Sequence, residues 1–141
     1  MTEYARDLSE HRLVKAKDVL RQAELLLKNH EYDGSVNRSY YTIFNAIRSL
    51  LALLGTDYRR HTGVISAFDR YFVKLGFLDK ALSKIAHNAF DSRQVSDYQD
   101  FQTPTAEQAK AQYDDATQFI TEIKQKRHEI FEEKIVLPPI S

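Results

Sequence analysis

The sequence of 141 residues contains no cysteine, only four glycines and only three prolines. Without cysteine, the chain has no disulfide bond, no thiol nucleophile and no zinc site built on thiolates. The four glycines stand singly, which excludes the glycine-rich loops that hold phosphates in many nucleotide-binding proteins. No apolar run reaches the roughly 20 residues needed to cross a bilayer. The scarcity of helix-breaking residues favours an all-α fold.

Neither sign of charge predominates, because 20 basic and 20 acidic residues give a formal net charge of zero. A global basic field for nonspecific nucleic-acid binding is therefore absent, although a local basic patch remains open. The first residues are polar and of mixed charge, unlike a signal peptide. We expect a cytoplasmic protein, not bound to a membrane, with one domain over residues 1–134 and a C-terminal tail over residues 135–141.

Metal chemistry finds little support in the sequence. Di-metal helical bundles use Glu-x-x-His pairs on facing helices, and no glutamate here has a histidine three residues later. His87 with Asp91, and His128 with Glu132, have i,i+4 spacing, which on an exposed helix is typical of a weak ion pair. We therefore expect neither a metal nor another cofactor.

Apolar residues recur at steps of three and four along most of the chain, which indicates helices. Five are expected: residues 9–29 capped by Ser9, 35–54, 62–75 capped by Thr62, a fourth from residue 79, and 105–134. Whether the fourth helix continues beyond Phe90 is left open. At 1.5 Å per residue the fifth would be about 45 Å long. It would then exceed the others, so its C-terminal part is expected to overhang the bundle or to meet a second subunit.

The second helix is apolar over more than half of its circumference, which predicts that it lies at the centre of the fold. It also carries Arg38, Asn45 and Arg48, whose spacing of seven and three residues places them on one face. Two arginines beside Tyr40 and Tyr41 suggest a surface that faces an anion. The alternative is that they are flanking residues paired with acidic side chains elsewhere.

One segment resembles a known family. The pattern Asn37-Arg38-x-Tyr40-Tyr41-x-x-Phe44-Asn45-Ala46-x-Arg48-x-Leu50-Leu51 is similar to the central helix of HEPN domains (higher eukaryotes and prokaryotes nucleotide-binding). The likeness continues at residues 61–64, at Phe68, at residues 72–76, and at Arg93 and Asp97-Tyr98. Together these residues resemble a small prokaryotic stand-alone branch of the family.

The resemblance implies an all-α, five-helix up-and-down bundle that forms a homodimer. It also implies a protein that binds a nucleotide or RNA, as the toxin-like partner of a minimal nucleotidyltransferase that acts as the antitoxin. Many members are metal-independent ribonucleases that carry Arg-x(4–6)-His near their late helices. In such an enzyme the histidine moves a proton of the ribose 2′-hydroxyl, and the arginine stabilises charge on the phosphate.

This sequence departs from the ribonuclease pattern. After Arg93 no histidine follows until His128, and Asn45 stands where relatives often carry histidine. His61, expected near the start of the third helix, is the best substitute, and its alternative role is that of a loop or capping histidine. Whether the protein is an enzyme is therefore left open.

The resemblance gives several residues an expected role. The candidate catalytic residues are His61 and Arg93, and the candidate ligand-binding residues are Arg38, Asn45, Arg48 and Asp97. Arg38, Arg48, His61 and Arg93 would form a polar cleft. Asp97 would orient Arg93 or simply form an i,i+4 ion pair with it. By analogy with toxin relatives, whose partner adenylylates a nearby tyrosine, Tyr98 is a candidate modification site.

These residues leave three hypotheses for the function. The first is a HEPN protein that binds a nucleotide or RNA within a toxin–antitoxin module. The second is a catalytically silent helical module that binds a partner protein. The third is a metal-independent ribonuclease in which His61 is the base. Clustered arginines around His61 would favour the first or third, and scattered arginines with acidic partners would favour the second.

Overall fold

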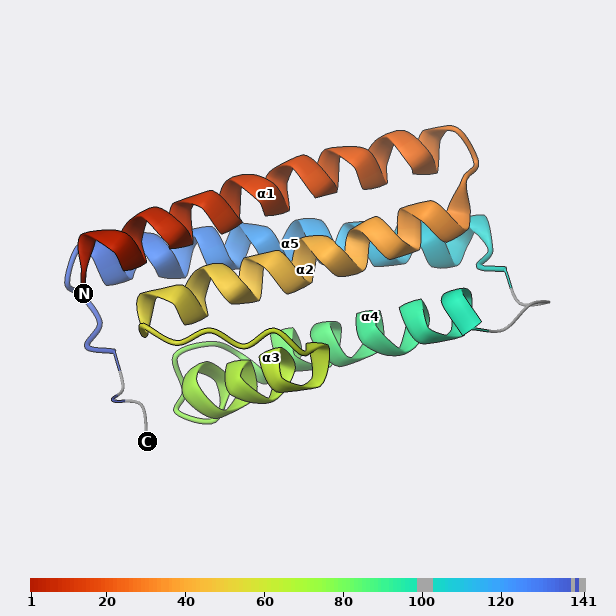
Figure 1. The fold of residues 1–141 in the computed structure, drawn as a ribbon. Helices are drawn as coiled ribbons and strands as arrows, with labels where there is room; N and C mark the ends of the chain where they lie inside the picture. The colour runs from red at the N-terminus through yellow and green to blue at the C-terminus, as the bar shows by residue number, and fades with distance from the viewer. Residues whose placement is uncertain (99–102, 138, 140–141) are drawn as a thin grey trace.

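The chain folds into a bundle of five α-helices in the computed structural model (Figure 1). The structure describes residues 1–98, 103–137 and 139, with the side chains of residues 94–98 excluded. The helices are α1 (Glu3–Lys28), α2 (Tyr32–Leu53), α3 (His61–Phe68), α4 (Lys80–Tyr98) and α5 (Ala106–Phe131), and a π-helical turn, η1 (Asp69–Val73), extends α3. The four long helices alternate in direction, and α3 is a short helix between α2 and α4 (Figure 1). The predicted all-α, five-helix up-and-down bundle is confirmed.

Helix α2 lies at the centre of the bundle and packs against all four other helices. Its inward residues are at most 2% exposed: Val36, Tyr40, Ile43, Ile47, Leu50 and Leu51. Burial of each such side chain contributes about 1.5–3 kcal/mol relative to exposure. On α1, Ala16 and Ala23 are fully buried, and these small side chains allow α1 and α2 to approach closely. The prediction of a central second helix is confirmed.

The first helix begins earlier than the sequence pattern predicted. It starts at Glu3, because the Thr2 hydroxyl accepts a hydrogen bond from the Ala5 amide at 3.0 Å and so caps the helix. Ser9, the predicted cap, is instead fully buried inside the helix. Its hydroxyl accepts a hydrogen bond of 2.9 Å from Nε of Arg127 on α5. Ser9 therefore joins two helices rather than beginning one.

Helix α5 has the predicted capping box, in which Thr105 and Gln108 exchange side-chain and backbone hydrogen bonds. Its predicted length is wrong, because it ends at Phe131 and has 26 residues, as many as α1. The C-terminal part does not overhang. There Arg127 pairs with Glu10 of α1 at 2.8 Å and also lies over the Phe131 ring. The length of α5 therefore gives no support for a second subunit, and the homodimer remains a prediction.

The third helical segment differs from its prediction at both ends. It begins at His61 with Arg60 as N-cap, so Thr62 is not the capping residue. The π-helical turn η1 then interrupts the regular pattern, because a π-turn holds one residue more than an α-helical turn. The helix does not continue after η1. Leu75, predicted to face inward on a helix, lies in the turn that follows and is 54% exposed, and Gly76 ends the segment with a φ of +84°.

Two histidines make ion-pair contacts on the helix surfaces. Nε2 of His87 lies 2.8 Å from a carboxylate oxygen of Asp69 in η1, so the predicted pairing of His87 with Asp91 is wrong. The reason is that η1 packs against α4 and presents Asp69 to it. The predicted pair of His128 and Glu132 is confirmed. Among the described residues, no helix is long and apolar enough to span a membrane.

Candidate anion-binding face

His61 is held by two aromatic residues of α2. Its Nδ1 lies 2.5 Å from the hydroxyl of Tyr40. The His61 ring centroid lies 4.6 Å from that of Phe44 and 5.4 Å from that of Tyr40. Tyr40 and Phe44 are four residues apart, so both rings project from one side of α2. The start of α3 therefore places His61 against the central helix in a defined orientation.

Arg93 reaches the same place from α4. Its guanidinium carbon lies 5.4 Å from the ring centroid of Tyr40 and 5.4 Å from that of Tyr41, within the range of a cation–π contact. Tyr41 also packs edge-on against His61, with ring centroids 5.8 Å apart. The structure thus brings together His61 and Arg93, the two candidate catalytic residues, although 32 positions separate them in the sequence.

Both titratable rings of this cluster have shifted pKa values. Burial, and secondly the positive charge of Arg93, lower the pKa of His61 below its usual value of 6.5. Burial raises the pKa of Tyr40 far above its usual value, so that Tyr40 stays a neutral phenol. At neutral pH the uncharged imidazole can accept a proton beside the arginine cation. Nε2 is the basic nitrogen in the tautomer in which Nδ1 carries the ring proton and donates it to the Tyr40 oxygen.

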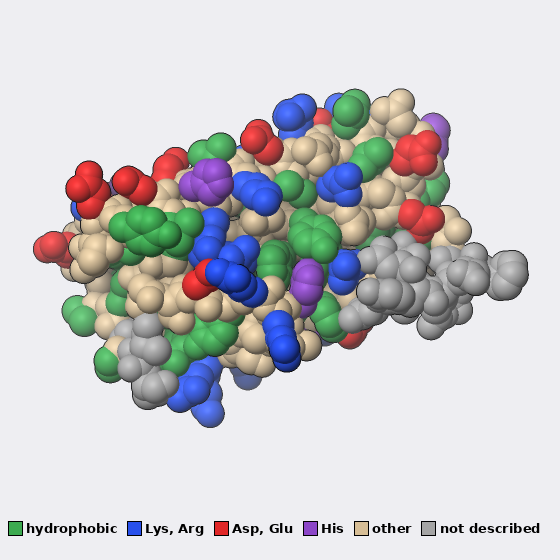
Figure 2. All heavy atoms as spheres, in the orientation of Figure 1, with side chains coloured by type: hydrophobic (Ala, Val, Ile, Leu, Met, Phe, Trp, Pro, Cys, Tyr) green, Lys and Arg blue, Asp and Glu red, His purple; other side chains and the backbone are tan. Residues whose placement is uncertain are grey.

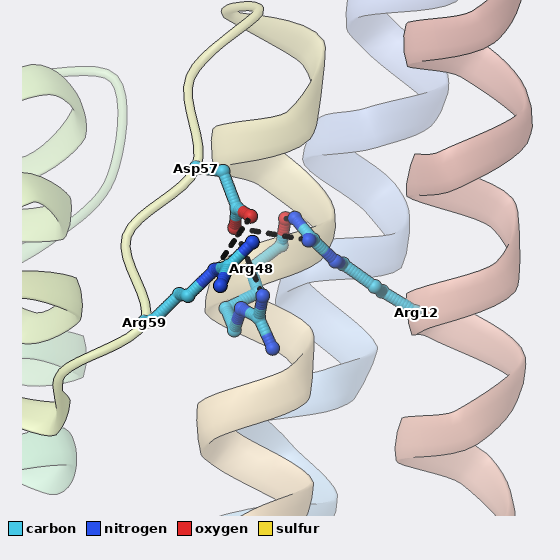
Figure 3. Close-up of polar contacts among 4 residues, drawn as sticks. All are labelled: Arg12, Arg48, Asp57 and Arg59. Carbon is cyan, nitrogen blue, oxygen red and sulfur yellow. Dashed lines mark hydrogen bonds and ion pairs between the residues drawn. The ribbon is translucent and has the colours of Figure 1, made fainter.

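A second cluster, which the sequence did not predict, surrounds Asp57 in the connection between α2 and α3 (Figure 3). One carboxylate oxygen accepts hydrogen bonds from Nη2 of Arg12 at 3.0 Å and from Nη2 of Arg48 at 2.9 Å. Arg59 approaches the other oxygen at 3.8 Å. Three arginines, from α1, α2 and the connection, therefore converge on a single carboxylate (Figure 3).

These four charges differ greatly in exposure. The side chain of Arg12 is 8% exposed and that of Arg48 is 22% exposed, whereas Asp57 is 41% and Arg59 is 89% exposed. Burial, followed by the charge of Arg48, lowers the pKa of Arg12. The hydrogen bond from Arg48 is the main reason why the pKa of Asp57 is lowered. The cluster is thus a partly buried charge network with one open side.

Phe44 connects the two clusters. Its ring lies against His61 on one side, and the guanidinium carbon of Arg48 lies 5.7 Å from its centroid. We call the combined surface the arginine–histidine face, and it consists of Arg12, Arg48, Arg59, His61 and Arg93. Figure 2 shows basic side chains and histidines gathered in the middle of the molecule, over α1, α2 and the connection to α3. A ligand with several negative charges would meet cations along this surface.

Arg38 does not belong to this face. Its Nε donates to the side-chain oxygen of Gln22 on α1 at 3.0 Å, and its Nη1 donates to Asn37 at 2.5 Å. It precedes Arg48 by ten residues, roughly 15 Å along the helix axis. The predicted cleft of four residues is therefore wrong in this respect, because Arg38 makes none of the contacts that join Arg48, His61 and Arg93.

The other candidate ligand-binding residues are less available for that role. Asn45 is only 5% exposed, and its side-chain amide donates to the backbone carbonyl of Tyr41 at 2.8 Å. The backbone of α4 continues through Asp97 and Tyr98, but their side chains lie outside the described residues. The predicted roles of Asp97 and Tyr98 remain predictions.

Arg12 and Asp57 are the main residues that the sequence analysis missed. A signal for Arg12 was present, because it shares a face of α1 with Ser9 and Ala16, which are both fully buried. A charged residue on a buried stripe needs a partner. Nothing in the local sequence identifies Asp57 as that partner. Among the described residues, no three histidine, aspartate or glutamate side chains could together hold a metal ion.

Comparison with known proteins identifies the family. The family model named HEPN domain matches residues 9–126, so the chain belongs to the HEPN domain family. A UPF0332 protein of Thermotoga maritima is 40% identical over 84 residues, which are 60% of this chain and 64% of that protein. A protein of Methanocaldococcus jannaschii, named a putative toxin, is 32% identical over 115 residues, which are 82% of this chain and 85% of that protein.

A further relative, a UPF0332 protein of Pyrococcus horikoshii, is 40% identical over 78 residues. The match covers 55% of this chain and 55% of that protein. The chain thus matches little more than half of the Pyrococcus protein and less than two thirds of the Thermotoga protein, but most of the Methanocaldococcus protein.

Proposed function

We propose that this chain is a toxin-like HEPN protein that binds RNA or a nucleotide through the arginine–histidine face. The observation that carries the proposal is the meeting of His61 and Arg93 over Tyr40 and Tyr41. Two relatives from Methanocaldococcus jannaschii that are named putative toxins support the toxin-like assignment.

The geometry favours recognition of a phosphate rather than of a base. Tyr40 is 1% exposed, so its ring is not available for stacking on a base. It instead holds His61 by a hydrogen bond and Arg93 by a cation–π contact. Because a guanidinium fixed in this way loses little further side-chain entropy on binding, it is preorganised for a phosphate oxygen.

A second candidate function is metal-independent cleavage of RNA. The observation that favours it is the lowered pKa of His61, which keeps the imidazole in its basic form beside the cation Arg93. In such a step Nε2 of His61 accepts the proton of a ribose 2′-hydroxyl, and the 2′-oxygen bonds to the adjacent phosphorus. The bond from phosphorus to the 5′-oxygen breaks, and that oxygen takes a proton from solvent. Arg93 stabilises the charge on the phosphate.

The partners belong to the same proposal. We propose a homodimer whose toxin-like action is controlled by a minimal nucleotidyltransferase, as the family resemblance implies. The catalytically silent interaction module is the alternative outcome. It is supported by the acidic partner that Arg48 has in Asp57, whereas the packing of His61 and Arg93 against the same two tyrosines supports a ligand.

The test is a titration of labelled single-stranded RNA, and separately of ATP, with wild-type protein and with His61→Gln and Arg93→Gln. Arg21→Gln is the matched control, because Arg21 is exposed on α1, outside the arginine–histidine face. We expect Arg93→Gln to weaken binding about tenfold, equal to about 1.4 kcal/mol. Wild-type affinity in Arg93→Gln, or an equal loss in Arg21→Gln, would refute binding at this face.

The same samples, incubated with RNA and a chelator, test cleavage. Cleavage by wild type that disappears in both His61→Gln and Arg93→Gln would assign the ribonuclease reaction. Binding without cleavage would leave a binding protein. If neither is seen with folded protein, while the protein copurifies with a coexpressed nucleotidyltransferase, the silent interaction module is the function.

A further inference from the structure

The cluster around Asp57 carries more positive charge than its carboxylate neutralises. Three guanidinium groups and one carboxylate give a net charge of +2. Arg12 and Arg48 are largely removed from solvent, so water screens their mutual repulsion poorly. A network with a purely structural role would gain from a second acidic residue, and the ion pairs of the described residues place none here.

The cluster also retains a hydrogen-bond donor and an open side. Nε of Arg48 is buried and has no hydrogen-bond partner within the described part of the chain. Such a donor is costly unless a ligand or water satisfies it. Asp57 and Arg59 are both exposed enough for an anion from solvent to reach them. The cluster thus has buried hydrogen-bond donors on its inner side and exposed charges on its outer side, which is the arrangement of a binding site.

We propose that Arg12, Arg48 and Arg59 form a binding site for a phosphate monoester, and that Asp57 is an internal anion that competes with this ligand. Guanidinium groups bind carboxylates and phosphates with the same fork of donors, so one can replace the other. A phosphate monoester is mostly a dianion at neutral pH, and Asp57 supplies only one negative charge. The ligand is thus the terminal phosphate of either a nucleotide or an RNA.

Displacement of Asp57 would also affect the position of His61. Both belong to one short stretch of chain, because the connection that carries Asp57 and Arg59 ends at the first residue of α3. On the other side, Phe44 contacts both Arg48 and His61. The inference rests on the proposed function, since it places a regulating phosphate site next to the His61–Arg93 pair. Its test does not depend on RNA binding or cleavage.

The test is calorimetric titration with inorganic phosphate at pH 7.5 and low salt. Asp57→Asn keeps the shape of the side chain and removes the competing charge, so we expect phosphate to bind about tenfold more tightly, or about 1.4 kcal/mol. Arg59→Ala should weaken phosphate binding, and the exposed Arg21→Ala should leave it unchanged. Equal affinities in wild type and Asp57→Asn would overturn the proposal. If Asp57→Asn fails to fold, unchanged binding in Arg59→Ala overturns it.

Further titrations with Asp57→Asn distinguish the source of the phosphate. Binding of AMP but not adenosine, with no preference for 5′-phosphorylated RNA, assigns a nucleotide. A preference for 5′-phosphorylated over 5′-hydroxyl oligonucleotides assigns an RNA end. The double variant His61→Gln/Arg93→Gln should still bind phosphate. If this variant no longer binds phosphate, the proposal that the Asp57 cluster is a separate site is overturned. The proposed function is refuted by a different result, namely wild-type affinity for RNA in Arg93→Gln.

Discussion

Asp57→Asn should destabilise the protein without ligand, and the structure sets the expected magnitude. The carboxylate accepts two hydrogen bonds from arginines, at 3.0 and 2.9 Å. Hydrogen bonds to charged groups contribute about 1.5–3 kcal/mol each, and neutral ones about half as much. Because Asp57 is 41% exposed, water compensates part of the loss. We therefore expect a decrease of about 1.5 kcal/mol in the free energy of unfolding, from these bonds combined.

Urea unfolding at pH 7, followed by circular dichroism, measures this loss. Asp114→Asn is the matched control, since Asp114 pairs with Lys110 on the surface of α5, where both side chains are more than half exposed. Surface pairs of this kind contribute about 0.3–0.5 kcal/mol. A loss in Asp57→Asn that is no larger than the loss in Asp114→Asn would refute the assignment of Asp57 as the anion that holds three arginines.

The pH dependence gives a second check on the same variant. The pKa of Asp57 is lower in the folded protein than its usual value of 3.8. The contribution of the carboxylate to stability is therefore fully present above the unfolded pKa and is lost as the pH falls through the folded pKa. The difference in stability between wild type and Asp57→Asn should stay constant from pH 7 to pH 5 and shrink below pH 3.8. A constant difference down to pH 3 would contradict this reasoning.

Three further predictions concern the surroundings of His61 and the helix ends. In Arg93→Gln the pKa of His61 should rise but stay below 6.5, because the lost charge of Arg93 is the smaller cause of its shift and burial is the larger one. NMR titration of His61 measures this change, and an unchanged pKa would contradict the coupling to Arg93. Tyr40→Phe removes the hydroxyl that contacts His61 and should lower the free energy of unfolding by about 1 kcal/mol. If urea unfolding shows no loss of stability, the hydrogen bond between Tyr40 and His61 is contradicted. Thr105→Ala removes the side-chain cap of α5 and should cost about 1 kcal/mol in urea unfolding, whereas Thr117→Ala, at an exposed position within that helix, should cost less.

The sequence predicts those features of the fold that depend on short-range periodicity. The central position of α2 follows from its apolar stripe, and the start of α5 follows from the capping box at Thr105. The π-turn η1 was not predictable in this way, because its extra residue does not alter the composition of the segment. The apolar spacing predicted a helix up to Leu75, whereas the helix gives way to η1 after Phe68, and Leu75 lies in the turn that follows η1.

The candidate site was predictable in part, because its residues come from different helices. The family pattern identified His61 and Arg93, but their proximity depends on the packing of α3 and α4 against the tyrosines of α2. Helical spacing grouped Arg38 with Arg48, whereas neighbouring elements separate them: Gln22 on α1 binds one, and Asp57 binds the other. Spacing along a helix gives the direction of a side chain and does not give its partner.

The connection between α2 and α3 determines the chemistry of the whole face. Gly55 begins it with a φ of +74°, a conformation that a residue with a Cβ adopts only with strain. This turn directs the chain back across α2, which brings Asp57 to Arg12 and Arg48 and then His61 to Tyr40. One segment therefore carries both the anion that pairs with the arginines and the histidine of the candidate site. An anion that displaces Asp57 would remove the hydrogen bonds that tie this segment to Arg12 and Arg48, and this physical link would join the proposed phosphate site to the position of His61.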